Sequence, residues 1–211
     1  VCSPTNSATR AQRVSKRCCA MACAFCATGT LGLKRSLTPG EVVAQVHAAR
    51  RFVEGLKGVE TPRGETPQGE TQQRQTQQRH TQQRSERELS HLVFMGMGEP
   101  LHNYERTRDA LRVLMDAHGR PFSSRKITIS TVGLVPAMHR FAEDFKGRVQ
   151  LALSLHAGTD ETRQKIIPTA KKWRLEALKE ALLAQPLPSN RVLMLEYVVL
   201  PGVNDSPEEL D

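Results

Sequence analysis

Cysteine is absent from the chain after residue 26, and this absence excludes a disulfide framework spread through the fold. The five cysteines of the 211-residue sequence are Cys2, Cys18, Cys19, Cys23 and Cys26. An odd, one-sided set of thiols fits a metal site in a reducing compartment better than it fits paired disulfides. We therefore expect the protein to lie in the bacterial cytoplasm or in an organellar stroma or matrix, and not to be secreted.

Long apolar runs are also lacking. No stretch approaches the roughly 18–20 apolar residues that a membrane-spanning helix requires, so we expect no membrane partner. The first ten residues are small and polar and do not resemble a signal peptide. Hydrophobic residues make up 38% of the chain and aromatic residues only 4%, which indicates that part of the chain does not contribute to a core.

That part is the segment 57–88, which has a five-residue repeat beginning at Thr61 and almost no apolar side chains. A period of five matches neither a helix nor a strand, and a tract that buries nothing cannot offset the entropy of ordering. We predict a disordered insertion at 57–88 within a single domain over residues 1–211. The net charge of +8 stays positive when the tract is removed, and a basic chain is typical of a protein with a polyanionic partner such as RNA.

Outside the tract, strand and helix patterns alternate. Thr38, Pro39 and Glu41 form the pattern of a capping box at the start of a helix. Strands are expected at 89–95, 126–131, 149–155 and 192–200, and helices at 38–56, 103–118, 135–145, 173–184 and from 206 onward. Alternating strands and helices predict parallel βαβ units. We therefore expect an α/β fold, a partial (βα) barrel incomplete at both ends.

Polar residues follow three of these strands, as Gly98-Glu99-Pro100, Ser130-Thr131 and Ser154-Leu155-His156. The carboxyl ends of parallel strands meet at one rim of a barrel, and that rim carries the active site in enzymes built this way. Each of these residues could also be an ordinary strand terminus. Their occurrence after three successive strands predicts a functional rim.

A second functional pattern is the C-x3-C-x2-C spacing of Cys19, Cys23 and Cys26. Three thiolates within eight residues can converge on an iron–sulfur cluster, zinc or Cu(I). A structural zinc site needs a fourth ligand, for which Cys18 and His47 are candidates. Three cysteines on a cubane cluster instead leave one iron open to a substrate.

Taken in order, these motifs resemble one enzyme family, the radical S-adenosylmethionine (SAM) RNA adenine-C2 methyltransferases, or RlmN-like proteins. The resemblance covers about residues 18–56 and 89–211 and rests on the cysteine triplet followed by Ala27-Thr28-Gly29, Met95-Gly96-Met97-Gly98-Glu99-Pro100, Ile129-Ser130-Thr131 and Leu153-Ser154-Leu155-His156-Ala157. It implies a 4Fe–4S cluster and SAM as cofactors, methylation of adenosine in large-subunit ribosomal RNA and transfer RNA, an electron donor such as flavodoxin or ferredoxin, and a monomer. A close relative methylates carbon 8 instead of carbon 2.

The resemblance also assigns roles to single residues. Cys19, Cys23 and Cys26 would bind the cluster, whose fourth iron would chelate the amino and carboxyl groups of SAM. The implied SAM contacts are Phe25, Gly98, Glu99, Ser130, Ser154, Leu155 and His156.

Two further cysteines act in this family, one that resolves the RNA adduct and one near the carboxyl terminus that carries the methyl group. Cys2 matches the resolving position, although more residues separate it from Cys19 than in the family. Cys18 stands where the family has glycine. No cysteine follows Cys26, so the chain lacks the methyl-carrying residue and is expected to be a fragment.

One alternative is a catalytically silent RNA-binding or zinc-stabilised remnant. A radical SAM enzyme with another substrate is disfavoured by the motifs at 95–100 and 153–157.

Overall fold

The computed structural model describes residues 19–55, 89–189 and 191–210. Cys2, Cys18 and the tract at 57–88 lie outside these ranges, so what the sequence predicts for them stays a prediction.

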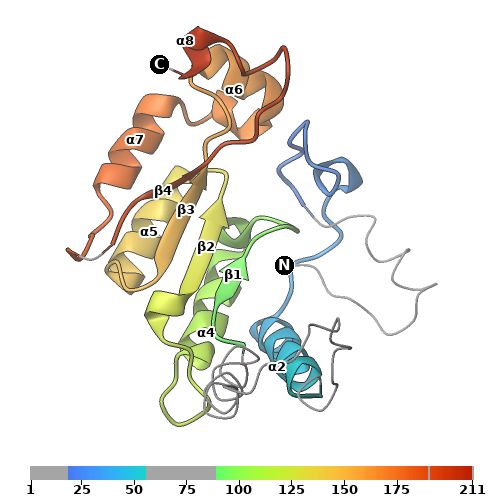
Figure 1. The fold of residues 1–211 in the computed structure, drawn as a ribbon, viewed down its shortest axis with the longest axis vertical. Coiled ribbons are helices and arrows are strands. Elements are labelled where there is room, and N and C mark those ends of the chain that lie inside the picture. The colour runs from blue at the N-terminus through green and yellow to red at the C-terminus, as the bar shows by residue number, and fades with distance from the viewer. Residues whose placement is uncertain (1–18, 56–88, 190, 211) are drawn as a thin grey trace, which may run out of the picture.

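A four-stranded parallel sheet forms the centre of the molecule (Figure 1). Its order follows the chain, with β1 (Leu92–Phe94), β2 (Ile127–Thr131), β3 (Gln150–Ser154) and β4 (Met194–Glu196) side by side. This arrangement confirms the predicted α/β class and the partial barrel.

Helices connect the strands, as the alternating pattern predicts. The helices are α2 (Pro39–Gly55), α4 (Tyr104–Leu114), α5 (Val135–Phe145), α6 (Asp160–Ile166), α7 (Leu175–Leu183) and α8 (Pro207–Leu210). Short 3-10 turns are η1 (Gly29–Leu31), η3 (Pro100–Asn103), η4 (Ser124–Lys126) and η5 (Pro168–Lys171). Helix α2 packs beside α4, and α5 packs beside α7 (Figure 1).

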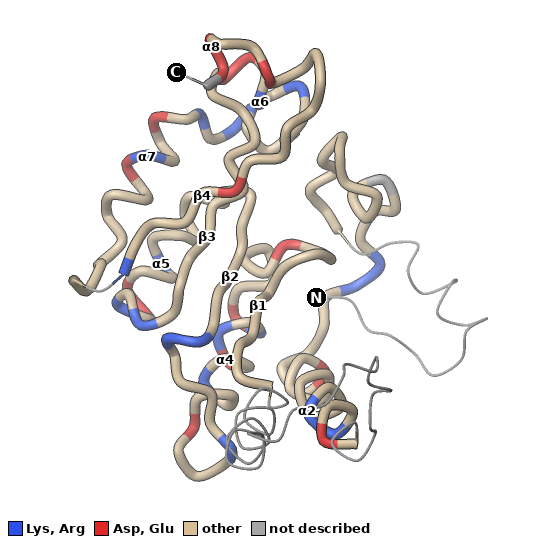
Figure 2. The backbone as a smooth tube through the Cα atoms, in the orientation of Figure 1, with Lys and Arg blue, Asp and Glu red and all other residues tan. Residues whose placement is uncertain are grey.

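The core lies between the sheet and these helices. Ile127 and Ile129 of β2 are fully buried, as are Leu111 of α4 and Met138 of α5. Removing such apolar surface from water is the main stabilising contribution to the fold. Charged residues are absent from β1, β2 and β3, whereas β4 ends on an acidic one (Figure 2).

Helix α2 begins as the sequence predicts. The backbone N–H of Thr38 donates to Glu41 Oε2 over 2.9 Å, and the N–H of Glu41 donates to Thr38 Oγ1 over 3.3 Å. These reciprocal bonds are a capping box, which satisfies N–H groups that the first helical turn leaves without partners. Asn103 Nδ2 donates to Leu37 O, 2.9 Å away, and so joins the start of α2 to η3.

The largest differences between the structure and the predicted elements lie in the edge strands and in α6. The edge strands are shorter than expected, since β1 covers only three residues of 89–95 and β4 only three of 192–200. Helix α6 was not predicted at all, and it is short and strongly polar. Its start is capped by Thr159, whose Oγ1 accepts from the N–H of Thr162. No helix among the described residues has both the length and the apolar character needed to cross a membrane.

Candidate functional site

The three cysteines lie in a tight loop that precedes α2. Cys26 N–H donates to Cys23 O (3.1 Å), and Gly29 N–H donates to Cys26 O (2.9 Å). Gly29 has to be glycine, because a Cβ there would lie 2.9 Å from Cys23 O. Cys19 N–H donates to Gly32 O and closes the loop at its start. These turns hold the three cysteines in one loop.

The pKa values of the three thiols are set first by burial. Cys19 and Cys23 are buried, and Cys26 is partly exposed. Burial, followed by the charges of Cys19 and Cys26, raises the pKa of the Cys23 thiol to about 12. Burial also raises the pKa of Cys19. For Cys26, burial acts upward, but bonds from the Thr28 hydroxyl (3.0 Å) and from backbone N–H groups outweigh it and lower the pKa.

The donor set fits an iron–sulfur cluster. Three buried or half-buried thiolates repel one another, and a cationic iron cluster removes that repulsion by ligation. A zinc site is a different geometry, in which all thiolates lie about 2.3 Å from one ion. Among the described residues, neither the three cysteines nor any other three His, Cys, Asp or Glu side chains are arranged to hold a single metal ion, whereas a cubane cluster takes each thiolate on a separate iron. His47, the distant candidate for a fourth zinc ligand, is exposed on α2.

The loop after β1 holds Glu99 at the carboxyl end of the sheet. Gly96 and Gly98 have φ of 97° and 84°, which a residue with a side chain rarely adopts. Glu99 Oε1 accepts from the N–H of Leu101 (3.0 Å), and Oε2 accepts from the N–H of Val132 (2.9 Å). Burial raises the pKa of Glu99 to about 7. Glu99 therefore joins the ends of β1 and β2.

Ser130 and Ser154 meet at a third residue, Glu196, which sequence reasoning missed. The Ser130 and Ser154 hydroxyls donate to Glu196 Oε2 over 3.0 and 3.1 Å, and their oxygens lie 3.3 Å apart. Oxygen Oε1 of Glu196 takes part in none of these bonds. The signal in the sequence was an acidic residue between Leu195 and Tyr197 in a predicted strand.

His156 is fixed in position by its backbone and by its ring. Its φ of 61° is left-handed. Its Nδ1 accepts from the N–H of Val198 (3.0 Å), so the neutral ring carries its proton on Nε2. Burial lowers the pKa of His156, which keeps the ring neutral at pH 7. The ring of Phe25 packs edge-on against it, with centroids 4.7 Å apart.

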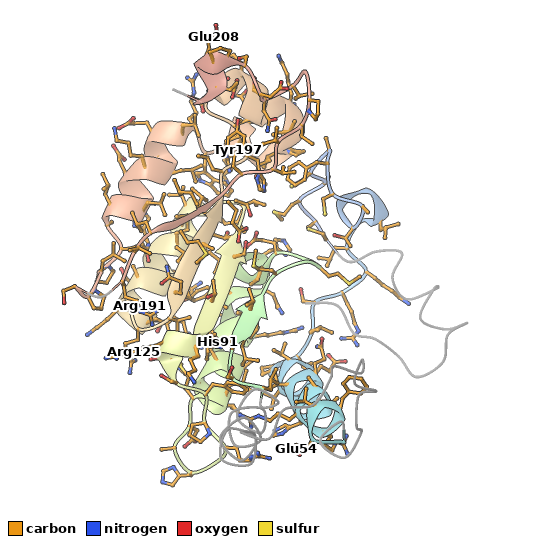
Figure 3. The ribbon with its side chains drawn as sticks, viewed as in Figure 1. Glu54, His91, Arg125, Arg191, Tyr197 and Glu208 are labelled. Carbon is orange, nitrogen blue, oxygen red and sulfur yellow. The ribbon has the colours of Figure 1, made fainter. Side chains whose placement is uncertain are left out.

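Asn204 is a second residue that sequence reasoning missed. It is fully buried, and its Nδ2 donates to His156 O (2.8 Å) and Val198 O (2.7 Å). Its backbone oxygen accepts from the hydroxyl of Tyr197 (2.7 Å), which lies beyond the end of β4 (Figure 3). Asn204 thus holds the turn of His156 against the segment after β4. The signal was an asparagine in a Pro-Gly-Val-Asn-Asp turn.

The structure brings most of the predicted site residues to one edge of the sheet. Phe25 of the cysteine loop contacts His156, Leu155 N–H donates to Glu196 O (2.9 Å), and the charge of Glu99 acts on Cys19 and Cys23. Cys2 lies outside the described residues.

The sequence and the structure both match known proteins. The pattern of the Radical SAM superfamily matches residues 63–211, a range that does not include the cysteine loop. The dual-specificity RNA methyltransferase RlmN 2 of Myxococcus xanthus (strain DK1622) is 47% identical over 191 residues, which are 90% of this chain and 44% of the relative. The dual-specificity RNA methyltransferase RlmN of Sorangium cellulosum (strain So ce56) is 42% identical over 191 residues, 90% of this chain and 41% of the relative.

A solved structure agrees with these matches. A radical SAM methyltransferase from Sphaerobacter thermophilus superposes with a TM-score of 0.70 at 36% identity, over 92% of this chain and 49% of that protein. The chain spans less than half the length of the relatives that it matches.

Proposed function

The chain belongs to the radical SAM superfamily, and from this we propose that it is the cofactor-binding part of an RNA methyltransferase that acts on carbon 2 of adenosine. The proposed substrates are large-subunit ribosomal RNA and transfer RNA. They rest on the names of relatives that are 40–47% identical to this chain and on the motifs at 95–100 and 153–157.

The observation that carries the proposal is the contact of the cysteine loop with the rim of the sheet. Phe25 lies directly before the last cysteine and packs on His156, which follows β3. A ligand held by the cluster at Cys19, Cys23 and Cys26 would therefore lie against the rim residues. The cofactors of the superfamily are a 4Fe–4S cluster and SAM, and the thiols and the polar rim suit these two groups.

In this proposal Cys19, Cys23 and Cys26 hold the cluster, and the rim holds SAM. When bound, the cluster supplies the single-electron chemistry that an adenine ring carbon requires, because that carbon is not a nucleophile. The rim offers both kinds of hydrogen-bonding partner. His156 presents a neutral Nε2–H donor, and Glu196 presents Oε1 as an acceptor for an ammonium or a ribose hydroxyl. The serine hydroxyls donate to Glu196 and keep their lone pairs for a ligand.

Other parts of the proposal follow from the family resemblance. They are a low-potential electron donor such as flavodoxin or ferredoxin, a monomeric state and a location in the bacterial cytoplasm or an organellar stroma or matrix. The methyl-carrying cysteine has no counterpart after Cys26. We therefore expect these 211 residues to cleave SAM without methylating RNA.

Anaerobic reconstitution with iron and sulfide tests the cofactor assignment. The protein should show broad absorbance at about 400 nm, as thiolate-ligated clusters do, and it should convert SAM to 5′-deoxyadenosine when a reductant is added. A Cys19→Ala/Cys23→Ala/Cys26→Ala variant should lose both signals. Tight binding of zinc without iron uptake would instead favour the zinc-stabilised remnant.

The RNA part is tested by adding unmodified ribosomal RNA, digesting it and measuring 2-methyladenosine by mass spectrometry. We expect release of 5′-deoxyadenosine without 2-methyladenosine. Methylation at more than trace turnover would overturn the expected lack of a methyl carrier and would assign that role to Cys2 or Cys18. Formation of 8-methyladenosine by a longer protein that contains this chain would overturn the assignment to carbon 2.

A further inference from the structure

Arg163 is a buried cation at the carboxyl ends of the strands. It lies on α6, and only 1% of its surface is exposed. Its Nε donates to Leu155 O (3.0 Å), and its Nη2 donates to Val132 O (2.7 Å) and Ser154 O (3.2 Å). The guanidinium thus holds together the chain segments that leave β2 and β3.

All three of these acceptors are neutral carbonyls. Among the described residues no carboxylate forms a salt bridge with Arg163. Asp160, three residues before Arg163 on α6, acts on it through its charge but hydrogen-bonds to Arg174 and to the N–H of Leu175. Burial lowers the pKa of Arg163 to about 10, so the side chain stays charged at neutral pH. A buried charge that no carboxylate contacts directly is costly, which indicates that a further anionic group belongs beside it.

The cysteine loop, which would carry the thiolate ligands of a bound cluster, is attached to the same helix as Arg163. Ala24, next to Cys23, donates its N–H to Ile166 O (2.8 Å) at the end of α6. Ile167 N–H in turn donates to Arg163 O (2.7 Å), so one helical turn carries both the cation and the attachment point of the loop. The charge of Arg163 acts to lower the pKa of Cys23, and that of Cys23 acts to raise the pKa of Arg163.

We propose that Arg163 is a positioning residue whose buried positive charge raises the reduction potential of the cluster bound by Cys19, Cys23 and Cys26. The inference rests on the proposed function, because it requires the cluster. Reduction adds one electron from a low-potential donor such as reduced flavodoxin and forms no bond. A fixed cation favours the more negative, reduced state, and net charge and burial are among the factors that set cluster potentials.

A purely mechanical role for Arg163 makes a different prediction. If the side chain only held the three carbonyls together, its loss would change stability but not the potential of a cluster that still binds. The effect of the positive charge of Arg163 therefore has to be measured separately from the effect of its three hydrogen bonds.

The pair Arg163→Lys and Arg163→Gln makes this separation. Both variants lose the planar guanidinium with its set of N–H donors and keep a polar N–H donor. Lysine also keeps the positive charge, and glutamine does not. The measurements are far-UV circular dichroism, iron content and the midpoint potential of the reconstituted cluster, obtained from an anaerobic redox titration followed by electron paramagnetic resonance. The matched control is Arg174→Gln, which removes a charge of the same sign from an exposed side chain close to α6.

We expect the lysine variant to keep a potential near that of the unmodified protein and the glutamine variant to shift to a more negative one. Arg174→Gln should leave the potential unchanged. Equal potentials in the lysine and glutamine variants would overturn the proposal. Loss of the cluster from both alike would do the same, because Arg163 would then serve the fold only. Failure of the unmodified protein to bind a cluster would instead contradict the proposed function.

Discussion

At the scale of single residues, the site is built from side chains that restrain one another. The hydroxyls of Ser130 and Ser154 both donate to one oxygen of Glu196, and Asn204 holds the backbone of His156. A polar group whose partners are already in place loses little freedom when a ligand binds, so such a site is preorganised. Glu196 is central to it, because its carboxylate orients two residues that the sequence predicts as SAM contacts.

Replacing Glu196 by glutamine tests this role. The variant keeps the size of the side chain but loses the charge that attracts both hydroxyls and the cationic ligand. A hydrogen bond to a charged group is worth about 1.5–3 kcal/mol, so SAM binding should weaken roughly tenfold or more. Equilibrium dialysis of the reconstituted protein measures this change, and the absorbance of the cluster should not alter. An unaltered affinity for SAM would contradict the role assigned to Glu196. The control is Glu176→Gln on the exposed face of α7.

At the scale of secondary-structure elements, the cysteine loop is anchored by the helix that follows it. Helix α2 begins at the capping box of Thr38 and Glu41, and Arg35 in the preceding segment donates to the Glu41 carboxylate (2.8 Å). The bond from Arg35, followed by that from the Thr38 N–H, lowers the pKa of Glu41 from an ordinary 4.5 to about 2. The first turn of α2 therefore depends on an ionised carboxylate.

This dependence predicts a pH effect with a definite sign. Because the pKa of Glu41 is lower in the folded protein, its ionisation stabilises the fold above pH 4.5, and the contribution disappears as the pH falls toward 2. Glu41→Gln should therefore be less stable than the unmodified protein at about pH 6, and the difference should shrink by about pH 3. Urea unfolding at the two pH values measures it. A difference that stays constant between them would contradict the ionic role of the cap.

At the scale of the whole molecule, the last helix is fastened to the loop that follows β3. Glu209 of α8 accepts hydrogen bonds through Oε2 from the N–H groups of Gly158 (2.7 Å) and Thr159 (3.1 Å), and through Oε1 from the Thr159 hydroxyl. Gly158 leaves no room for a side chain, since a Cβ would lie 2.2 Å from Glu209 O. The two segments lie about fifty residues apart in the sequence, and their contact secures the start of α6.

Glu209→Ala should therefore destabilise the protein by about 1–2 kcal/mol, the range found for lost helix caps and charged hydrogen bonds. Its neighbour provides the control, because Glu208 lies at the outer end of α8, away from the sheet (Figure 3), and Glu208→Ala should change little. Thermal unfolding of the two variants measures the difference. Equal melting temperatures would show that the contact of α8 adds nothing to the fold.

Sequence patterns predicted the central strands better than the edge strands, for a physical reason. Strands β2 and β3 each have two neighbours, and their bounds fall within one residue of the expected 126–131 and 149–155. The edge strands β1 and β4 pair on one side only, so fewer of their apolar residues join the ladder. The capping box of α2 was found because it is local in sequence.

The partners of the site residues could not be predicted in the same way. Ser154 lies beside Glu196 because of the register between β3 and β4, and register is a tertiary property. Arg163 was missed because its acceptors are backbone carbonyls of other segments, which leave no mark on the pattern of residue types. Patterns therefore showed which residues end the strands, but not which of them touch.

The contact between Phe25 and His156 has a consequence for how the two cofactors depend on each other. One ring belongs to the loop that carries the thiols, and the other belongs to the rim. If filling the rim steadies that contact, the free energy gained is shared by both sites, and thermodynamic reciprocity makes the coupling equal in each direction. Bound SAM should then slow the loss of iron in air, and the cluster should strengthen the binding of SAM by the same coupling free energy. A ligand bound at the rim would then also protect the metal.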